Sequence, residues 1–513
     1  MTLISRVLGF IRDQVFAIVL GAGPLTDAFF VAFKIPNFLR RLFAEGAFAQ
    51  SFVPVFTEYK ETRSRADLAA LAARVNGTLG LILILLSILG SLFAPTLVSI
   101  FAPGFEPDDE RRVLTAQMLR ITFPYLFFIS LVAYAGGVLN SFQRFAVPAI
   151  TPVLLNICLI TAALWGTQFF PVPVIAIAWG VFAAGLLQLL FQLPSLHKLD
   201  LLVLPKWGWR DSGVRRIMQL MVPAIVGSSV AQINLLLDTI IASFLVAGSV
   251  SWLYYADRLV EFPLGVFGIA IATVMLPRLS SIHASENRKD FQNTLDWGVR
   301  LGLAIALPCA AGLCLLSIPM LATLFGYGEF TNSDVQMSAW SLKAYSLALP
   351  GFILIKILAP GFFARQNTKT PVRIGIIAMV CNMLYNLILV GGMVWLVIPA
   401  PHAGLALATA LSANQQAFML FRQLHREKVF AVAPGTIRLL KHVLFATFCM
   451  AVCISLLSPA PDQWFAMQAG QRATTLAGII MVAVVVYVLT LLITGIRPRN
   501  LLIDKVDNTS FNS

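Results

Sequence analysis

The chain has 513 residues, of which 58% are hydrophobic and only 12% are charged, and its formal net charge is +13. Soluble domains carry roughly 25% charged residues, so this composition excludes an ordinary soluble protein. The positive charges form no dense basic run and no aromatic-basic platform, which argues against a nucleic-acid partner. Long apolar stretches recur from end to end, each long enough to cross a bilayer as a helix. The sequence predicts an all-α polytopic membrane protein.

About fourteen transmembrane helices are expected from the apolar stretches. In chain order they lie near 3–20, 25–56, 73–101, 113–140, 145–167, 172–196, 215–246, 250–277, 293–324, 335–363, 371–396, 402–424, 436–457 and 474–495. Nearly all loop Lys and Arg residues fall in the connections after even-numbered helices and in the C-terminal tail. The other connections hold only Arg111, Arg112 and Arg472. Because short basic loops stay in the cytoplasm, both termini are expected there. The N-terminus shows no cleavage site of the A-x-A kind, so no signal peptide is expected.

The chain repeats itself. "LAPGFFARQNTKTPV" (358–372) resembles "YAGGVLNSFQRFAVP" (134–148), and "AFMLFRQLHREK" (417–428) occupies the same place in its half as "QLLFQLPSLHK" (188–198). Two pseudo-symmetric six-helix lobes and two appended C-terminal helices are therefore predicted. The predicted parts are an N-terminal lobe (1–198), a cytoplasmic linker (199–213), a C-terminal lobe (214–428), and the last two helices with the tail (429–513). Parallel repeats around a central site are a recurrent transporter plan.

Several cations lie inside apolar helices rather than at their ends: Arg6, Arg12, Lys34, Arg40, Arg258 and Lys356. A cation at a helix centre costs ~2.5–3.5 kcal/mol on insertion scales, so these side chains must face protein, water or a polar ligand. One interpretation is internal pairing with the nearby acids Asp13, Asp27, Glu45, Asp257 and Glu261. The other is a water-filled cationic cavity for a multiply anionic ligand, because guanidinium binds phosphate in bidentate fashion. The surplus of cations favours the cavity.

The segment "SWLYYADRLVEFPLG" (251–265) carries part of this pattern. Ser251 and Arg258 are seven residues apart and share one helical face, and Glu261 lies one turn beyond Arg258.

A second charged stretch is "FFVAFKIPNFLRRLFAEGAF" (29–48). An unbroken helix places four charged residues on one stripe: Asp27, Lys34, Arg41 and Glu45. Arg40 would then lie about 100° away, but Pro36 can kink the helix and redirect the residues after it. Either of the two adjacent arginines can face the ligand on this reasoning.

A coupling-ion site is a separate possibility. Asp238 lies inside an apolar helix, and Asn382 and Asn386 lie one turn apart on another. An acid and two amide oxygens can hold Na⁺ or a proton, and a carboxyl group hydrogen-bonded within the bundle explains Asp238 equally well.

No catalytic signature is visible. The five histidines lie in or beside loops without ligand spacing, and no phosphate-binding P-loop occurs. No extramembrane segment is long enough for a separate active site. We therefore expect no enzyme and no cofactor, and an energy source in an Na⁺ or H⁺ gradient, the membrane potential or downstream consumption of the product.

Four segments resemble the MurJ (MviN) lipid II flippases: "SRVLGFIRD" (5–13), "GPLTDAFFVAFKIPNFLRRLFAEGAFAQSFVP" (23–54), "SVSWLYYADRLVEFPLGV" (249–266) and "ILAPGFFARQNTKTPV" (357–372). The resemblance covers essentially the whole chain, although relatives usually carry further residues before the first motif. It implies membership of the MATE-like multidrug/oligosaccharidyl-lipid/polysaccharide superfamily. It also implies the flipping of undecaprenyl-pyrophosphoryl disaccharide-pentapeptide across a bacterial inner membrane, with cell-wall synthesis proteins as further partners.

The resemblance also implies site residues. The family's functionally important charges fall on Arg6, Arg12, Asp27, Arg40 and Arg258, and this favours Arg40 over Arg41. Positions in or near the family's cavity are Glu45, Ser251, Glu261 and Lys356. Some relatives bind sodium at the seventh and eleventh helices, which adds weight to Asp238, Asn382 and Asn386. Two alternatives stay open: an O-antigen-type lipid-oligosaccharide flippase, and a MATE-type multidrug exporter, whose cationic drugs call for an acidic cavity.

Overall fold

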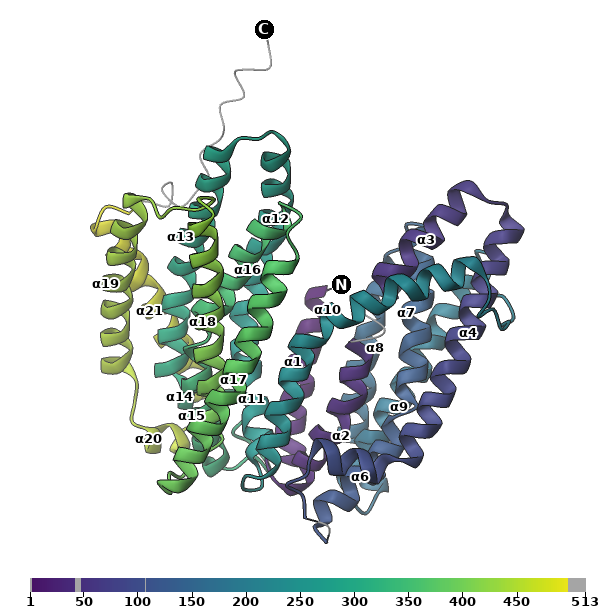
Figure 1. The fold of residues 1–513 in the computed structure, drawn as a ribbon. Helices are drawn as coiled ribbons and strands as arrows, with labels where there is room; N and C mark the ends of the chain where they lie inside the picture. The colour runs from purple at the N-terminus through teal and green to yellow at the C-terminus, as the bar shows by residue number, and fades with distance from the viewer. Residues whose placement is uncertain (1, 42–47, 107, 497–513) are drawn as a thin grey trace. The chain divides into compact units, whose positions relative to one another are not determined.

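The computed structural model describes residues 2–41, 48–106 and 108–496, and the regular structure within these ranges is entirely helical (Figure 1). Contacts between residues divide the chain into two compact units. Unit 1 comprises Met1–Ser251 with Tyr327–Thr331, and unit 2 comprises Trp252–Gly326 with Asn332–Ser513. The expected all-α architecture is confirmed. The predicted lobe boundaries near residues 198, 213 and 428 stay a prediction.

Unit 1 is a bundle in which α4, α7, α8 and α9 run alongside one another (Figure 1). Its helices are α1 (Thr2–Leu20), α2 (Pro24–Arg40), α3 (Ala49–Thr62), α4 (Arg65–Leu92), α5 (Ala94–Phe101), α6 (Glu110–Thr122), α7 (Tyr125–Ser141), α8 (Ala146–Leu164), the short η2 (Gly166–Phe169), α9 (Pro173–His197) and α10 (Ser212–Ser243). Phe52 of α3 packs on Tyr134 of α7 with ring centroids 5.4 Å apart. Gly137 permits this approach, because a Cβ there would lie 2.9 Å from the Phe52 ring.

Unit 2 continues from α11 (Ser249–Pro263), which runs through a π-helical turn, η3 (Leu264–Gly268), into α12 (Ile269–Ala284). The following helices are α13 (Arg288–Leu315), α14 (Ser317–Leu324), α15 (Asn332–Ser346), α16 (Leu349–Phe363), α17 (Lys369–Trp395), α18 (Ala403–Arg426), α19 (Pro434–Leu457), α20 (Pro461–Ala466) and α21 (Ala469–Ile493). The last two long helices, α19 and α21, pack on each other, and α19 also packs on α13 (Figure 1).

A buried arginine, Arg472, connects α21 to α14 and α20 in the C-terminal part of unit 2. Arg472, near the start of α21, donates to the carbonyls of Ala322 and Gly326 at the end of α14, each at 3.0 Å. It also donates to Trp464 and Phe465 of α20 at 3.0 Å. Helix C-termini leave carbonyls without intrahelical partners, and the planar guanidinium satisfies several of them at once.

Ten helical segments of the described ranges are long and apolar enough to cross a membrane. The four other predicted spans correspond to α1, α2 with α3, α10 and α18. The count of fourteen therefore stays a prediction. Several predicted spans are each built from two helices, such as α4 with α5 and α13 with α14.

The expected repetition is present in the two units. The helices α4 and α13 each have 28 residues, and α5 and α14 each have 8. The N-cap side chain accepts from the backbone three residues on in both cases, Ser64 from Asp67 and Asn287 from Asp290.

The ends of other corresponding helices repeat as well. Gln143 after α7 and Gln366 after α16 both have φ of 58°. The next residue in each case, Arg144 or Asn367, donates its backbone N–H to a carbonyl five residues back at 2.9 or 3.0 Å. This is the left-handed C-cap that ends many helices, and here it ends two helices that the repeat relates.

Candidate functional site

Arg12 of α1 contacts Asp13 and Asn156 within unit 1. Its Nη2 lies 2.7 Å from Asp13 Oδ1, and its Nη1 donates to Asn156 Oδ1 of α8 at 3.1 Å. The Asn156 amide in turn donates to the Ser5 carbonyl at 3.1 Å, so it orients Arg12 and ties α8 to α1. The Arg12 side chain is 12% exposed. One ion pair neutralises part of its charge, while Arg6, on the same helix, is exposed.

Asp27 of α2 is buried and caps the start of α11. Its Oδ2 accepts from the Gly248 N–H at 2.7 Å, and its Oδ1 accepts from the Ser251 N–H at 2.9 Å and the Ser251 hydroxyl at 2.6 Å. A carboxylate that accepts free N–H groups at a helix start stabilises that helix. The structure thus brings together two predicted site residues, Asp27 and Ser251, and makes Asp27 a positioning residue for α11.

Lys34, one of the predicted intramembrane cations, contacts α10. Its Nζ donates to the Thr239 hydroxyl at 2.7 Å, and Thr239 in turn donates to the Leu235 carbonyl at 2.9 Å. Thr239 is buried, and Lys34 is half-buried. The lysine is therefore anchored within unit 1 while part of its side chain stays accessible.

The arginine pair at the end of α2 is half-buried. Arg40 Nε donates to Asn37 Oδ1 one turn back at 2.9 Å. Arg41 is exposed to a similar degree, so burial does not indicate which of the two arginines faces a ligand. Pro36 lies inside α2, and the helix continues past it. Glu45, another predicted site residue, lies outside the described residues.

In unit 2, Arg258 of α11 forms the expected contact with the residue one turn on. Its Nη1 lies 2.5 Å from Glu261 Oε2, and its guanidinium lies over the Tyr254 ring at 4.7 Å. The side chains of Arg258 and Glu261 are 28% and 46% exposed. Lys356 of α16 is exposed, and it takes part in no ion pair with another residue of the described ranges.

The residues of the predicted sodium site lie in different units. Asp238 of α10 belongs to unit 1 and is half-buried, whereas Asn382 and Asn386 of α17 belong to unit 2 and are fully buried. Within the described ranges, no group of three His, Cys, Asp or Glu side chains is arranged to hold a metal ion. The coupling-ion site stays a prediction.

Three partners were not among the predicted site residues. Asn156 accepts from Arg12, Thr239 accepts from Lys34, and Tyr254 lies under Arg258. Asn156 carried a signal, since it is a lone amide in the apolar stretch 153–164. The Tyr254 contact joins residues four apart on one helix and was readable from the sequence, whereas the Thr239 contact depends on packing that no local pattern encodes.

The predicted cations lie in three kinds of setting. Arg12 pairs with Asp13 and Arg258 pairs with Glu261, Lys34 and Arg40 are half-buried and donate to Thr239 and Asn37, and Arg6 and Lys356 are exposed. A guanidinium binds anionic groups through several N–H donors in a planar fork. The arrangement within each unit suits the binding of anionic groups without covalent chemistry.

Repeated helical units that carry cations within apolar helices are typical of a membrane transporter. A solved MATE-family multidrug resistance transporter in an inward-facing conformation has the same fold, with a TM-score of 0.69 over 83% of this chain and 94% of that one. At 14% sequence identity, this likeness shows the fold alone.

The sequence profile described as "Lipid II flippase MurJ" matches residues 16–492, and the chain belongs to this family. The "Probable lipid II flippase MurJ" of Haemophilus influenzae is 46% identical over 98% of this chain and 99% of its own length. The "Lipid II flippase MurJ" of Burkholderia cenocepacia is 42% identical over 88% and 87%. A solved structure, "Lipid II flippase MurJ, inward closed conformation", has a TM-score of 0.79 at 28% identity and covers 96% of this chain and 97% of that one. The resemblance seen in the sequence is confirmed.

Proposed function

We propose that this chain moves lipid II, the undecaprenyl-pyrophosphate-linked peptidoglycan precursor, from the cytoplasmic to the periplasmic leaflet of the bacterial inner membrane. The observation that carries the proposal is the family match over nearly the whole chain, at 46% identity to a relative named for lipid II flipping. Transport by alternating access of two repeated units fits this family and fold. The activity is transport rather than catalysis.

Arg6, Arg12, Arg40 and Arg258 bind the pyrophosphate and sugar headgroup in this proposal. Two phosphates carry several acceptor oxygens, which guanidinium groups match in bidentate geometry. The Asn156 and Asp13 contacts support the role of Arg12, because they fix the orientation of its guanidinium. The proposal also assigns to headgroup binding the residues that the family resemblance places in or near the cavity, Lys34, Glu45, Ser251, Glu261 and Lys356. Asp27 holds the start of α11 in place.

The orientation and energy source belong to the same proposal. The excess of Lys and Arg in alternate connections supports cytoplasmic termini. An Na⁺ or H⁺ gradient or the membrane potential drives the cycle, with Asp238, Asn382 and Asn386 as the sodium ligands. Cell-wall synthesis proteins take up the product in the periplasm.

The proposal is tested by depleting the gene and scoring complementation. Arg12→Ala and Arg258→Ala should each fail to restore growth, with lipid II accumulating and cells lysing, although the proteins insert normally. Lys343→Ala is the matched control, because Lys343 is a helical cation that lies over the Trp340 ring at 5.0 Å, and it should complement fully. Full growth with either arginine variant would overturn that residue's role, and normal lipid II levels on depletion would overturn the function.

A further inference from the structure

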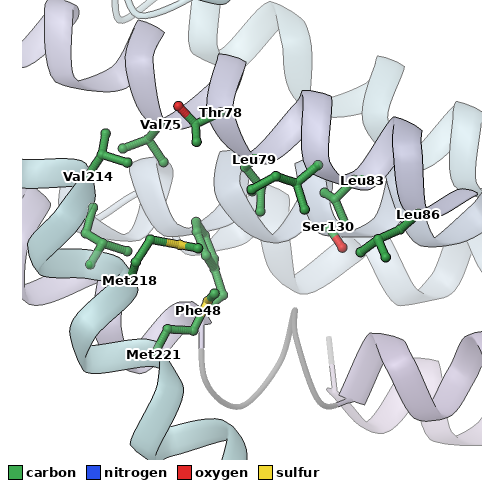
Figure 2. Close-up of a pocket in the computed structure, with 12 residues that line it drawn as sticks. Phe48, Val75, Thr78, Leu79, Leu83, Leu86, Ser130, Val214, Met218 and Met221 are labelled. Atoms are coloured by element: carbon green, nitrogen blue, oxygen red, sulfur yellow. The ribbon is translucent and has the colours of Figure 1, made fainter. Parts of the chain in front are cut away.

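An apolar cavity lies between α4, α7 and α10 of unit 1 (Figure 2). Its volume is about 110 Å³, and aliphatic and methionine side chains form most of its wall, among them Leu79, Leu83, Met218 and Met221. An apolar cavity of similar size, ~150 Å³, stays dry and binds benzene-sized molecules. The cavity is therefore suited to a short hydrocarbon segment rather than to water.

The cavity reaches the lipid-facing side of α4. Leu86 lines it and is 37% exposed, and the neighbouring Leu85 and Leu89 are about half exposed, at 52% and 49%. In a membrane-spanning helix, such apolar exposure faces lipid chains. A chain can thus enter from the bilayer at Leu86 without crossing polar surface.

The other end of the cavity adjoins a basic, aromatic linker. Thr78 lines the cavity, and its hydroxyl accepts the N–H of Gly208 in the segment that joins α9 to α10 at 3.0 Å. In this segment the rings of Trp207 and Trp209 are stacked with centroids 6.1 Å apart, and both are exposed. Exposed tryptophans beside basic residues are typical of a membrane interface.

Three cations at this end have no acidic partner in the described part of the chain. Arg74 pairs with Asp211 and Arg216 pairs with Glu58, which leaves Lys206, Arg210 and Arg215, all exposed. The charge bias of the connections indicates that this end lies at the cytoplasmic surface, where anionic lipids concentrate. The cationic rim and the apolar cavity meet at Thr78, as the headgroup and chain of one lipid would require.

We propose that this cavity binds a short segment of one acyl chain of an anionic phospholipid of the cytoplasmic leaflet, with its headgroup on Lys206, Arg210 and Arg215. A linear acyl chain fits a cavity of this volume better than a branched isoprenoid chain, which is wider. None of the cavity residues is among the cations that bind lipid II in the proposed function, so the two proposals stand independently. The bound lipid holds the linker and the first turns of α10 against α4.

The test uses the purified full-length protein and a phosphatidylglycerol with a photoreactive diazirine on one acyl chain. Adducts should map to peptides that carry residues 75–86 and 214–221. Leu79→Trp and Met218→Trp fill the cavity from two walls and should each lower these adducts tenfold or more. Leu81→Trp is the matched control, because Leu81 is 44% exposed on the same helix and does not line the cavity, and it should leave the adducts unchanged.

Two further arms test the headgroup and the depth of the cavity. Lys206→Ala with Arg210→Ala should weaken binding about fivefold per cation removed, whereas Arg288→Ala with Lys289→Ala, two exposed cations of unit 2, should not. The Ser130 hydroxyl is buried in the wall and has no hydrogen-bond partner among the described residues, so Ser130→Ala should keep or improve binding of a hydrocarbon chain.

Several results would overturn the proposal. Adducts that survive both Trp variants place the lipid elsewhere. Equal labelling by a phosphatidylcholine probe removes the headgroup assignment. Stronger labelling by a polyprenyl-phosphate probe assigns the cavity to an isoprenoid chain, and loss of binding in Ser130→Ala indicates a polar ligand. Elution of each variant as a monodisperse peak in size-exclusion chromatography shows that the protein is folded.

Discussion

The segment that follows α9 in unit 1 and the segment that follows α18 in unit 2 are attached by chemically different interactions. After α9 in unit 1, the linker lies along α4, with Lys206 N–H on the Ala73 carbonyl at 2.9 Å and Gly208 N–H on Thr78 at 3.0 Å. After α18 in unit 2, Thr436 joins α13, donating its hydroxyl to Asp296 at 2.6 Å. Arg300 completes that cluster, 2.6 Å from the same carboxylate.

The difference shows that a repeated fold can keep a junction while its chemistry changes. At Lys206 and Gly208 the unit 1 junction uses neutral groups and needs close approach, since a Cβ on Gly77 would overlap the Lys206 backbone, and its ion pair of Arg74 with Asp211 is solvent-exposed. The unit 2 junction uses a buried carboxylate that must be fully satisfied, because an unpaired buried charge is costly. Sterics therefore control one junction, and electrostatics control the other.

The largest expected effect is at the charged junction. Asp296→Ala leaves Arg300 and Thr436 without their shared acceptor and should lower the free energy of unfolding by about 3 kcal/mol. Asp290→Ala is the control on the same helix, because the Asp290 carboxylate accepts a solvent-exposed hydrogen bond from the Asn287 amide, at 2.7 Å. Thermal unfolding in detergent measures both. Equal effects of the two variants would show that the cluster contributes nothing beyond a surface contact.

A smaller loss is expected at the neutral junction. Gly77→Ala forces the linker away from α4 and should cost about 2 kcal/mol, in the range of overpacked cores. Gly391→Ala is the matched control in α17, where a Cβ meets nothing within 4 Å, so it should be neutral or slightly stabilising. If Gly77→Ala unfolds like Gly391→Ala, close approach does not control this junction.

The smallest effect is expected at the turns that follow α7 in unit 1 and α16 in unit 2. In unit 1, Phe142 lies under Lys60 and Arg65, at 5.1 and 5.6 Å, whereas in unit 2 Arg365 pairs with Glu427. Partial burial opposes ionisation of Glu427, but hydrogen bonds from Gln423 and Arg365 outweigh it and lower its pKa below the ordinary 4.5. Glu427→Gln should therefore cost less than about 1 kcal/mol at neutral pH.

The pH dependence of that cost has a definite sign. Because the folded-state pKa of Glu427 is lowered, its contribution is fully present above about pH 4.5 and is lost as the pH falls through the lowered value. The difference in melting temperature between wild type and Glu427→Gln should thus shrink in acid. The corresponding difference for Phe142→Ala should change much less, since the Phe142 ring contacts two cations and the nearby carboxylate, Glu61, pairs with Lys60 at 3.0 Å. A difference that grows in acid would contradict the assignment.

Much of the fold could be predicted from sequence because hydrophobic runs and loop charges are local signals. The helices, the repetition of the corner at 143 and 366, and the contact of Arg258 with Glu261 follow from patterns within a few residues. The breaks between α4 and α5 or α13 and α14 were missed, because an apolar run gives no sign of where one helix ends inside it.

The site was predictable in its residue types but not in its contacts. Intramembrane cations are recognisable because lipid cannot solvate them. The capping of α11 by Asp27 joins positions 221 to 224 residues apart, and the hydrogen bond from Arg12 to Asn156 joins positions 144 apart. Sequence reasoning offered Asp27 as an ion-pair partner, whereas the structure places it on backbone N–H groups, since only the fold brings the free end of α11 to it.

The proposed function requires the helical cations of this chain, Arg12 among them, to bind lipid II during its passage across the membrane. The most direct measurement is the fraction of lipid II that a membrane-impermeant reagent reaches in intact cells depleted of the native gene and supplied with wild type, Arg12→Ala or Lys343→Ala. The account predicts that wild type and Lys343→Ala expose lipid II at the outer leaflet and that Arg12→Ala, at equal abundance in the membrane, leaves it unreachable. Equal exposure with Arg12→Ala would contradict the account.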